Sequence, residues 1–415
     1  MSFPRYERYK ESGVEWLGEV PEGWEVIQFK HFVDIQNGTD HKHVEQEEGY
    51  PVIGSGGVFT YASDFLFDGE SVLLGRKGTI DKPLYVVGRF WTVDTMYWTK
   101  ISPNAFGRFV YYSALTIPFN YYSTSTALPS MTKGALSSHL VTFPPLPEQQ
   151  SIADFLDRET SKIDVLVAEQ ERLIGLLAEK RQATISHAVT KGLNPAAPLK
   201  DSGVEWLGEV PEHWEITRLA NIFHEAIEKG SPDLPFLSVS IHHGVSDREL
   251  DEEERDRKVM RSEDPESNKR VRSGDLVYNM MRAWQGGFGA VKTDGMVSPA
   301  YVVARPRIDL NTSYIELLLR TPQATEEMRR YSRGITDFRL RLYWDSFKDI
   351  CIALPPKVEM DQIIERIAAL NENFSALITE SMSMIGLLKE CRGALISAAV
   401  TGKIDVRSFN EPKNS

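Results

Sequence analysis

The sequence predicts an α+β fold, with two mixed α/β domains separated by two long antiparallel helices (a coiled-coil spacer) and a pseudo-twofold internal repeat. Three observations predict it. The chain repeats two of its own segments, and two long proline-free stretches carry a heptad-like apolar pattern. The blocks between these features are rich in short apolar runs and turn residues, which is typical of strands and tight turns.

The composition is that of a globular protein. The chain has 415 residues, 41% hydrophobic and 26% charged, and at roughly 100–200 residues per domain this length predicts about two to four domains. A wholly disordered chain is excluded, and no run approaches the roughly 18 apolar residues of a membrane span. The first ten residues lack the apolar region of a secretory signal. Two cysteines, Cys351 and Cys391, exclude a disulfide framework or a four-cysteine zinc site, so we expect a reduced, cytoplasmic setting.

The net charge of −12 is concentrated in two short segments. Residues 1–25 carry −3 and residues 201–215 carry −5, whereas the long blocks 26–143 and 216–354 carry −1 each. A nearly neutral block can still present a basic face, because a ligand responds to the local field. The acidity therefore does not exclude nucleic acid as a partner.

Two pairs of segments repeat. Residues 11–25, ESGVEWLGEVPEGWE, match residues 201–215, DSGVEWLGEVPEHWE, at thirteen of fifteen positions, and residues 174–190 match residues 385–401 at twelve of seventeen. Because the long blocks show no obvious match, we interpret the flanks as a shared scaffold and the blocks as two different recognition heads; recent duplication with drift is the alternative. The predicted parts are the N-terminal scaffold segment 1–25, the first head 26–143, the first helix and linker 144–200, the repeated scaffold segment 201–215, the second head 216–354, and the second helix and tail 355–415.

Two long helices are predicted where proline is absent, between Pro147 and Pro195 and between Pro356 and Pro412. Alternating steps of four and three residues, the period of a coiled-coil seam, connect Ile363, Ile367, Leu370, Phe374, Leu377, Ser381, Met384, Leu388, Cys391, Leu395 and Ala398. The equivalent line in the first copy is Ile152, Leu156, Glu159, Ile163, Leu166, Gln170, Leu173, Leu177, Lys180, Thr184 and His187. A helix from Glu148 to Val189 would be about 63 Å long and could not bury its stripe alone, so the simplest partner is the other copy's helix.

An antiparallel pairing would give one chain two unlike heads related by a pseudo-twofold axis. Duplex DNA presents the same symmetry, and dimeric proteins bind half-sites about one helical turn apart. Such a chain would read two different half-sites separated by an unread gap. The alternative is a coiled coil that only spaces two protein-binding heads, that is, a two-headed adaptor.

In the first head, the segment Gly75–Ile80 (GRKGTI) places two cations between glycines directly after an apolar run. Cations, backbone amides and a hydroxyl would suit a phosphate or a base edge, although a solvated hairpin tip fits equally. The pattern is not a Walker A loop. The hydroxyl-rich segment Ser123–Lys133 either donates to phosphates or is solvated. The predicted DNA contacts of this head are Ser55, Arg76, Lys77, Thr79, Lys82, Thr124, Thr126 and Lys133.

In the second head, five arginines between Arg329 and Arg341 fall within thirteen residues. Arginine reads guanine bidentately and grips phosphate, and the alternative for some of them is an ion pair with Glu326 or Glu327. The segment Tyr278–Gly289 follows a strand-like run and offers side chains that stack on bases or hydrogen-bond to them. The predicted DNA contacts of this head are Arg282, Trp284, Gln285, Arg333, Thr336, Arg339 and Arg341.

Catalytic patterns are weak. The string Asn194–Ala197 lacks the second proline and the aromatic residue of a methyltransferase motif. A metal-dependent nuclease using Asp233, Asp256 and Lys258 fits a loose pattern, but Asp256 lies in a charged run that looks solvated. His41 with His43, and His242 with His243, have no further ligand at convincing spacing. We therefore expect no catalytic, cofactor-binding or metal-ligating residue in this chain.

Taken together, these features resemble the specificity subunit of a type I restriction–modification system over nearly the whole chain. The resemblance rests on the segments 13–24 and 203–214, on PPLPEQQ at 144–150 leading into a helix that ends near Thr190, and on the loops 75–80 and 282–289. The second copy departs from the pattern, since KVEMD at 357–361 replaces LPEQQ, and this puts the start of the second helix in doubt.

The resemblance implies a non-catalytic subunit that takes part in restriction and in adenine-specific DNA methylation. Each head would be a target-recognition domain for one half of a bipartite site, and the helices would set the gap between the halves. Two modification subunits would dock on the scaffold and bring S-adenosylmethionine, while restriction subunits would bring ATP with Mg. Docking or scaffold roles are predicted for Trp16, Trp24, Trp206 and Trp214, with packing inside each head as the alternative.

Overall fold

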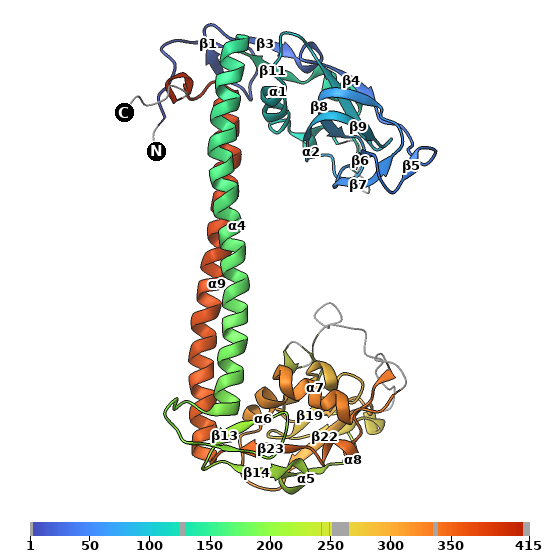
Figure 1. The fold of residues 1–415 in the computed structure, drawn as a ribbon, viewed down its shortest axis with the longest axis vertical. Coiled ribbons are helices and arrows are strands. Elements are labelled where there is room, and N and C mark those ends of the chain that lie inside the picture. Colours follow the sequence, from blue (N-terminus) through green and yellow to red (C-terminus); the bar gives the residue numbers. More distant parts are fainter. Residues whose placement is uncertain are drawn as a thin grey trace. The chain divides into compact units, whose positions relative to one another are not determined.

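The computed structural model describes residues 3–123, 129–241, 243–248, 250, 265–334 and 339–409. The chain divides into two compact units. Unit 1 comprises residues 1–172 and 381–415, and unit 2 comprises residues 173–380. The long helices α4 (Leu146–Lys191) and α9 (Lys357–Val400) each contribute one half to each unit (Figure 1).

Unit 1 is built on a seven-stranded sheet with the order β4-β10-β8-β9-β6-β7-β5. All its neighbouring strands pair antiparallel except β6 and β9, which are parallel. The strands are β4 (Val33–Asn37), β5 (Glu45–Gln46), β6 (Tyr50–Gly54), β7 (Gly57–Ala62), β8 (Phe67–Gly75), β9 (Leu84–Thr92) and β10 (Met96–Ile101). Three short helices follow, α1 (Gly107–Ala114), α2 (Phe119–Tyr122) and α3 (Lys133–Ser138).

Two small antiparallel sheets join this head to the helix pair. The first pairs β1 (Tyr9–Glu11) with β2 (Glu19–Pro21), and the second pairs β3 (Glu25–Gln28) with β11 (Leu140–Phe143). Unit 2 repeats both sheets, with β12 (Leu199–Asp201) on β13 (Glu209–Pro211) and β14 (Glu215–Arg218) on β23 (Cys351–Leu354). The repeated scaffold segments therefore fold alike in the two units.

The second head contains a four-stranded antiparallel sheet with the order β15-β22-β19-β20. Its strands are β15 (Phe223–Glu225), β19 (Leu276–Asn279), β20 (Phe288–Ala290) and β22 (Tyr301–Pro306). Smaller ladders are β16 (Val239–Ser240) with β17 (Gly244–Val245) and β18 (Lys269–Val271) with β21 (Gly295–Val297). The helices are α5 (Leu219–Ile222), α6 (Thr312–Leu319), α7 (Pro322–Tyr331) and α8 (Trp344–Phe347).

The two heads share one strand plan although their sequences show no obvious match. The order β4-β10-β8-β9 in unit 1 corresponds to β15-β22-β19-β20 in unit 2, and every neighbouring pair in both sets is antiparallel. The internal repeat therefore extends into the heads through these four strands, although the sheet of unit 1 also includes β6, β7 and β5.

The helices α4 and α9 pack together and run in opposite directions. In unit 1, Arg392 Nε donates to Asp164 Oδ1 at 2.8 Å, which joins the first half of α4 to the last half of α9. In unit 2, Arg181 Nε donates to Asn371 Oδ1 at 2.7 Å, which joins the opposite halves. The predicted antiparallel pair is confirmed.

One of the two lines of the predicted seam is correct at the N-terminal end of each helix but wrong over the middle of both helices. In α9, Leu377, Met384 and Cys391 are exposed, whereas the residues one position later, Ile378, Ile385 and Arg392, are half-buried. In α4, Leu166, Leu173 and Lys180 are exposed, whereas Val167, Ile174 and Arg181 are half-buried. The inward line includes Arg181 and Arg392. Their guanidinium groups donate hydrogen bonds to residues of the facing helix. A search for apolar residues alone therefore selected the neighbouring line.

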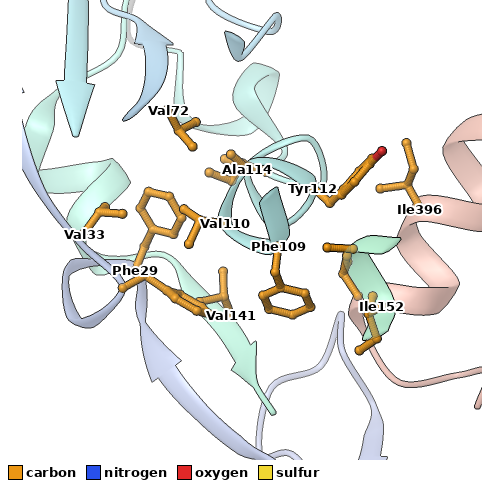
Figure 2. Packing of buried hydrophobic residues seen from close by; sticks show 14 of the residues in the cluster. Phe29, Val33, Val72, Phe109, Val110, Tyr112, Ala114, Val141, Ile152 and Ile396 are labelled. Atoms are coloured by element: carbon orange, nitrogen blue, oxygen red, sulfur yellow. The ribbon is translucent and has the colours of Figure 1, made fainter. Parts of the chain in front are cut away.

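The core of unit 1 lies where the head meets the helices. Figure 2 shows Phe109, Val110 and Tyr112 of α1 between the strand residues and the long helices, with Ile152 of α4 and Ile396 of α9 on the far side. These side chains are at most 3% exposed. A single apolar cluster includes residues of α1, of the strands, of α4 and of α9. The core therefore packs the head against both helices.

Among the residues that the structure describes, no helix combines the length and the apolar character needed to cross a membrane.

Candidate nucleic-acid interface

The loop Gly75–Ile80 is held against the turn between β9 and β10. The backbone N–H groups of Arg76 and Lys77 both donate to the Thr95 carbonyl, at 2.8 and 3.1 Å, and Arg76 Nη1 donates to the Asp94 carbonyl at 3.2 Å. A Cβ on Gly75 would lie 2.4 Å from the Thr79 carbonyl oxygen, so only glycine fits there. The backbone of this loop is therefore hydrogen-bonded to the β9–β10 turn, while Lys77 and Thr79 remain exposed.

The structure brings this loop together with part of the hydroxyl-rich segment. Gly78 N–H donates to the Pro129 carbonyl and Met131 N–H donates to the Arg76 carbonyl, both at 2.9 Å. Lys77 and Lys133 are both exposed, and Thr132 caps α3 by accepting from Ala135 N–H at 3.1 Å. Two segments more than fifty residues apart thus form one surface that carries two exposed cations.

The other predicted residues of the first head are more scattered. Thr79 and Lys82 are exposed in the loop and just beyond it, and Ser55 is half-buried in the turn between β6 and β7. No hydrogen bond among the described residues ties Ser55 to the Gly75–Ile80 loop. Thr124 and Thr126 lie outside the described residues.

The corresponding loop of unit 2 follows β19 and is equally fixed. The Asn279 side-chain oxygen accepts from Met281 N–H at 3.0 Å, and Trp284 Nε1 donates to the Met281 carbonyl at 3.1 Å. The Arg282 carbonyl accepts from the N–H groups of Gln285 and Gly287, each at 2.9 Å. Arg282 and Trp284 are half-buried, whereas Gln285 is exposed.

The arginine cluster lies beside this loop. Arg333 and Arg341 exchange backbone hydrogen bonds at 2.9 and 3.0 Å, and Leu342 N–H donates to the Met280 carbonyl at 2.9 Å. The side chains of Arg333, Arg339 and Arg341 are exposed. Thr336 lies outside the described residues.

Arg329 and Arg330 have structural partners. Arg330 pairs with Glu327 and with Glu205 of the scaffold segment, at 3.3 and 2.9 Å, and these contacts raise its pKa. The Arg329 guanidinium lies 5.9 Å from the centre of the Trp284 ring. The ion-pairing alternative is thus confirmed for Arg330.

The two heads build the same loop pair. In each, the residue after the matching strand β8 or β19 (Arg76 or Met280) accepts a backbone hydrogen bond from the segment before a short helix (Met131 or Leu342). Met131 and Leu342 are separated by 211 positions, which is also the offset of the repeated helices. The equivalence was not visible in the sequence, because the loops share no residue pattern. Their matching rests on backbone bonds between distant segments.

The four scaffold tryptophans divide into two kinds. Trp24 and Trp214 are 1% and 0% exposed. Their Nε1 atoms donate to Glu148 at 3.0 Å and to Glu359 at 3.2 Å. These two tryptophans pack within their own unit.

The remaining two lie nearer the surface. Trp16 is 45% exposed and stacks on His139, with ring centres 5.3 Å apart. Trp206 is half-buried and donates to the Cys351 carbonyl at 3.2 Å. The doubtful start of the second helix is also resolved, since α9 begins at Lys357, 211 residues after the start of α4.

Unit 1 also contains a cavity of about 450 Å³ between α1, α4 and α9. Arg108 pairs with Asp157 there, and Tyr112 Oη donates to Asp157 at 2.6 Å. Burial, and then this hydrogen bond, raise the pKa of Tyr112 to about 12. The pair Arg392–Asp164 closes the other wall. Each cation in the cavity faces a carboxylate, so the cavity offers no net charge to a phosphate. The contacts of Arg108 and Tyr112 with Asp157 instead join the head to α4.

The residues weighed for metal or nuclease chemistry do not form a site in the part of the chain that the structure describes. No group of three histidine, cysteine or carboxylate side chains lies close enough there to hold a metal ion. Asp233 is exposed, and Asp256, Lys258 and His242 lie outside the described residues.

Comparisons with known proteins agree with one another. Residues 21–173 match the model of the type I restriction modification DNA specificity domain. The type I restriction enzyme EcoBI specificity subunit of Escherichia coli is 21% identical over 425 residues, which cover 95% of this chain and 89% of that protein.

Two solved structures share the fold. The HsdS subunit from Thermoanaerobacter tengcongensis has a TM-score of 0.51 at 15% identity, over 93% of this chain and 98% of its own. A chain from a structure described as the basis of complex assembly and conformational transition of the type I R-M system has a TM-score of 0.60 at 14% identity, over 92% and 98%. The family model over residues 21–173 and the relative that spans the chain show that this protein is similar to the specificity subunits of type I restriction–modification systems.

Proposed function

We propose that each head of this specificity subunit reads one half of a bipartite DNA site. The observation that carries the proposal is the shared loop pair. Two heads of one strand plan hold the same two segments together by equivalent backbone bonds, but present different side chains. A common frame with exchanged surface residues is what reading two different sequences requires, because base edges are distinguished by side-chain donors and acceptors.

In the first head, Arg76, Lys77 and Lys133 supply the cations and Thr79 a hydroxyl. In the second head, Arg282, Arg333, Arg339 and Arg341 supply cations, and Gln285 an amide. Phosphate contacts from such groups position the protein, and contacts to base edges specify the sequence. The chain itself performs no catalysis in this proposal.

The helix pair sets the spacing between the half-sites and docks two modification subunits. Six exposed apolar residues on the helices form three pairs whose members are 211 positions apart. Leu166 and Leu377 are 51% and 47% exposed, Leu173 and Met384 are 41% and 44%, and Leu176 and Leu387 are 52% and 59%. Unit 1 carries Leu166, Met384 and Leu387, and unit 2 carries the matching Leu377, Leu173 and Leu176. Two equivalent apolar faces are suited to two copies of one partner.

The chemistry then comes from the partners. The modification subunits bring S-adenosylmethionine for adenine methylation, and the restriction subunits bring ATP with Mg for translocation and cleavage. The assembly acts on double-stranded DNA in the cytoplasm.

Exchange of residues 26–143 for the corresponding block of a relative with a different target tests the proposal. Sequencing of methylated positions in a host that carries the complete system should show one half-site changed and the other retained. An unchanged motif would refute the proposal. Absence of any salt-sensitive DNA binding by the assembled complex would instead favour the two-headed adaptor.

A further inference from the structure

The loop pair of unit 2 exposes two large side chains that carry no charge. Met281 is 45% exposed and Tyr343 is 44% exposed. They lie on adjoining segments, because the Met280 carbonyl accepts a hydrogen bond from Leu342 N–H at 2.9 Å. Neighbouring exposed apolar residues that are rimmed by polar side chains are typical of interaction sites, whereas single exposed apolar residues are common.

Both residues are held in place. The backbone of Met281 is bonded on both sides, by the Asn279 side chain at its N–H and by the Trp284 indole at its carbonyl. Tyr343 precedes α8, and its carbonyl accepts from the N–H groups of Ser346 and Phe347 at 3.1 and 2.9 Å. A fixed backbone with an exposed side chain loses little conformational freedom when the side chain is inserted into a partner.

The surroundings indicate a partner with a phosphate backbone. Arg282 is the next residue after Met281, and Arg341 lies two residues before Tyr343. Arg333 is joined to Arg341 by two backbone hydrogen bonds. The apolar pair is thus flanked by cations from three points of the chain, which suits duplex DNA.

Unit 1 differs at the same two positions. The matched backbone bond, from Met131 N–H to the Arg76 carbonyl, places Lys77 where unit 2 has Met281 and Thr132 where unit 2 has Tyr343. One head therefore presents a cation and a hydroxyl, and the other presents a thioether and a phenol ring, on the same frame.

We propose that Met281 and Tyr343 form a wedge that enters the base stack of the half-site bound by the second head. This inference rests on the proposed function and adds a mode of reading to it. Apolar side chains that separate a base step bend the duplex, and the cost depends on the sequence of that step. The second head therefore selects a deformable step, whereas the first head reads undistorted DNA through polar groups.

The experiment uses the assembled complex with its modification subunits. The probe is a duplex that carries the methylome-defined target, with 2-aminopurine placed at one position at a time and never at the methylated adenine. With the unmodified complex, we expect a severalfold rise in fluorescence at one step of the second half-site and none in the first. The double variant Met281→Ala/Tyr343→Ala should lose that rise and bind about 10- to 100-fold more weakly. Met281→Leu should retain both properties.

Two controls separate this inference from the proposed function. Ile308 lies just after the C-terminal end of β22, and its side chain is also 45% exposed. The variant Ile308→Ala should behave like the unmodified complex. Arg333→Ala/Arg341→Ala removes predicted contacts of the same head and should weaken binding. If the arginine variant loses the second half-site while the Met281/Tyr343 variant keeps the fluorescence and affinity, the wedge is wrong and the proposed function stands. If neither variant affects that half-site, the proposed function of the second head fails as well.

Discussion

Trp214 Nε1 donates a hydrogen bond to Glu359 at 3.2 Å, and this bond joins the scaffold segment 201–215 to the first turn of α9. Trp24 and Glu148 make the matching bond in unit 1 at 3.0 Å. Each indole is almost fully buried. The nearly verbatim repeat thus has a physical explanation, because each copy of the segment supplies the donor for a carboxylate at the start of a long helix.

Replacing Trp214 by Phe should lower the free energy of unfolding of unit 2 by about 1–3 kcal/mol, since a largely covered carboxylate loses a donor. Urea unfolding monitored by circular dichroism would measure the change. The matched control is Trp16→Phe, which alters an indole that is 45% exposed and should change stability by less than about 0.5 kcal/mol. Equal effects of the two variants would contradict a structural role for the Trp214–Glu359 bond.

Lys77→Glu should weaken reading of one half-site only. Lys77 is exposed on a loop fixed by Thr95, so its reversal changes the local charge without removing a backbone bond. We expect at least a tenfold loss of affinity. The slope of log affinity against log salt concentration should become shallower by about one, because one fewer counterion is released on binding. Titration of the assembled complex with its target at several salt concentrations measures both quantities.

Lys100→Glu is the matched control, because Lys100 is exposed near the other end of β10 from Thr95. It should leave affinity unchanged. Loss of assembly by Lys77→Glu, with DNA contact intact, would show that the loop belongs to a subunit interface.

Leu387→Glu should remove one modification subunit from the complex, and Leu176→Glu should remove the other. Both side chains are more than half exposed, so the folded chain tolerates the charge while an apolar interface does not. Native mass spectrometry would count the bound subunits. Val87→Glu, at a residue 66% exposed on β9, should retain two, and a full complement with either helix variant would disprove the proposed docking faces.

Acid should destabilise unit 1 through His139. Burial lowers the pKa of His139 to about 4, below the value of 6.5 expected when unfolded. The neutral ring is therefore favoured in the folded state, and its contribution is complete above pH 6.5 and lost as the pH falls towards 4. Between pH 7.5 and pH 5 the loss should be about 2 kcal/mol.

Urea unfolding of the unmodified chain and of His139→Gln at both pH values isolates this contribution. The variant should show a pH dependence smaller by about that amount. Identical dependences would mean that His139 is protonated in the folded state at pH 5.

Sequence reasoning located the long helices well because their signals are local. Proline is absent from the interior and the helix ends are repeated, so α4 begins two residues before the predicted Glu148 and α9 begins directly after Pro356. Over the middle of each helix the prediction placed one seam line a residue too early, because the inward line there includes Arg181 and Arg392. Their burial is acceptable only with Asn371 and Asp164 on the facing helix, and that pairing is not visible in one helix alone.

The chain's own sequence determined the two-copy plan, the helix pair and the choice of Arg76, Lys77 and the arginine cluster as candidate contacts, since these rest on repeats, periods and charges of neighbouring residues. Tertiary structure alone decided which distant segments meet. Pro129–Met131 lies against Gly75–Ile80, and Leu342 lies against Met280, through backbone hydrogen bonds that carry no side-chain signature. The sequence does not predict a role for Tyr343 for the same reason, because its position beside Met281 depends on the folding of two segments about sixty residues apart.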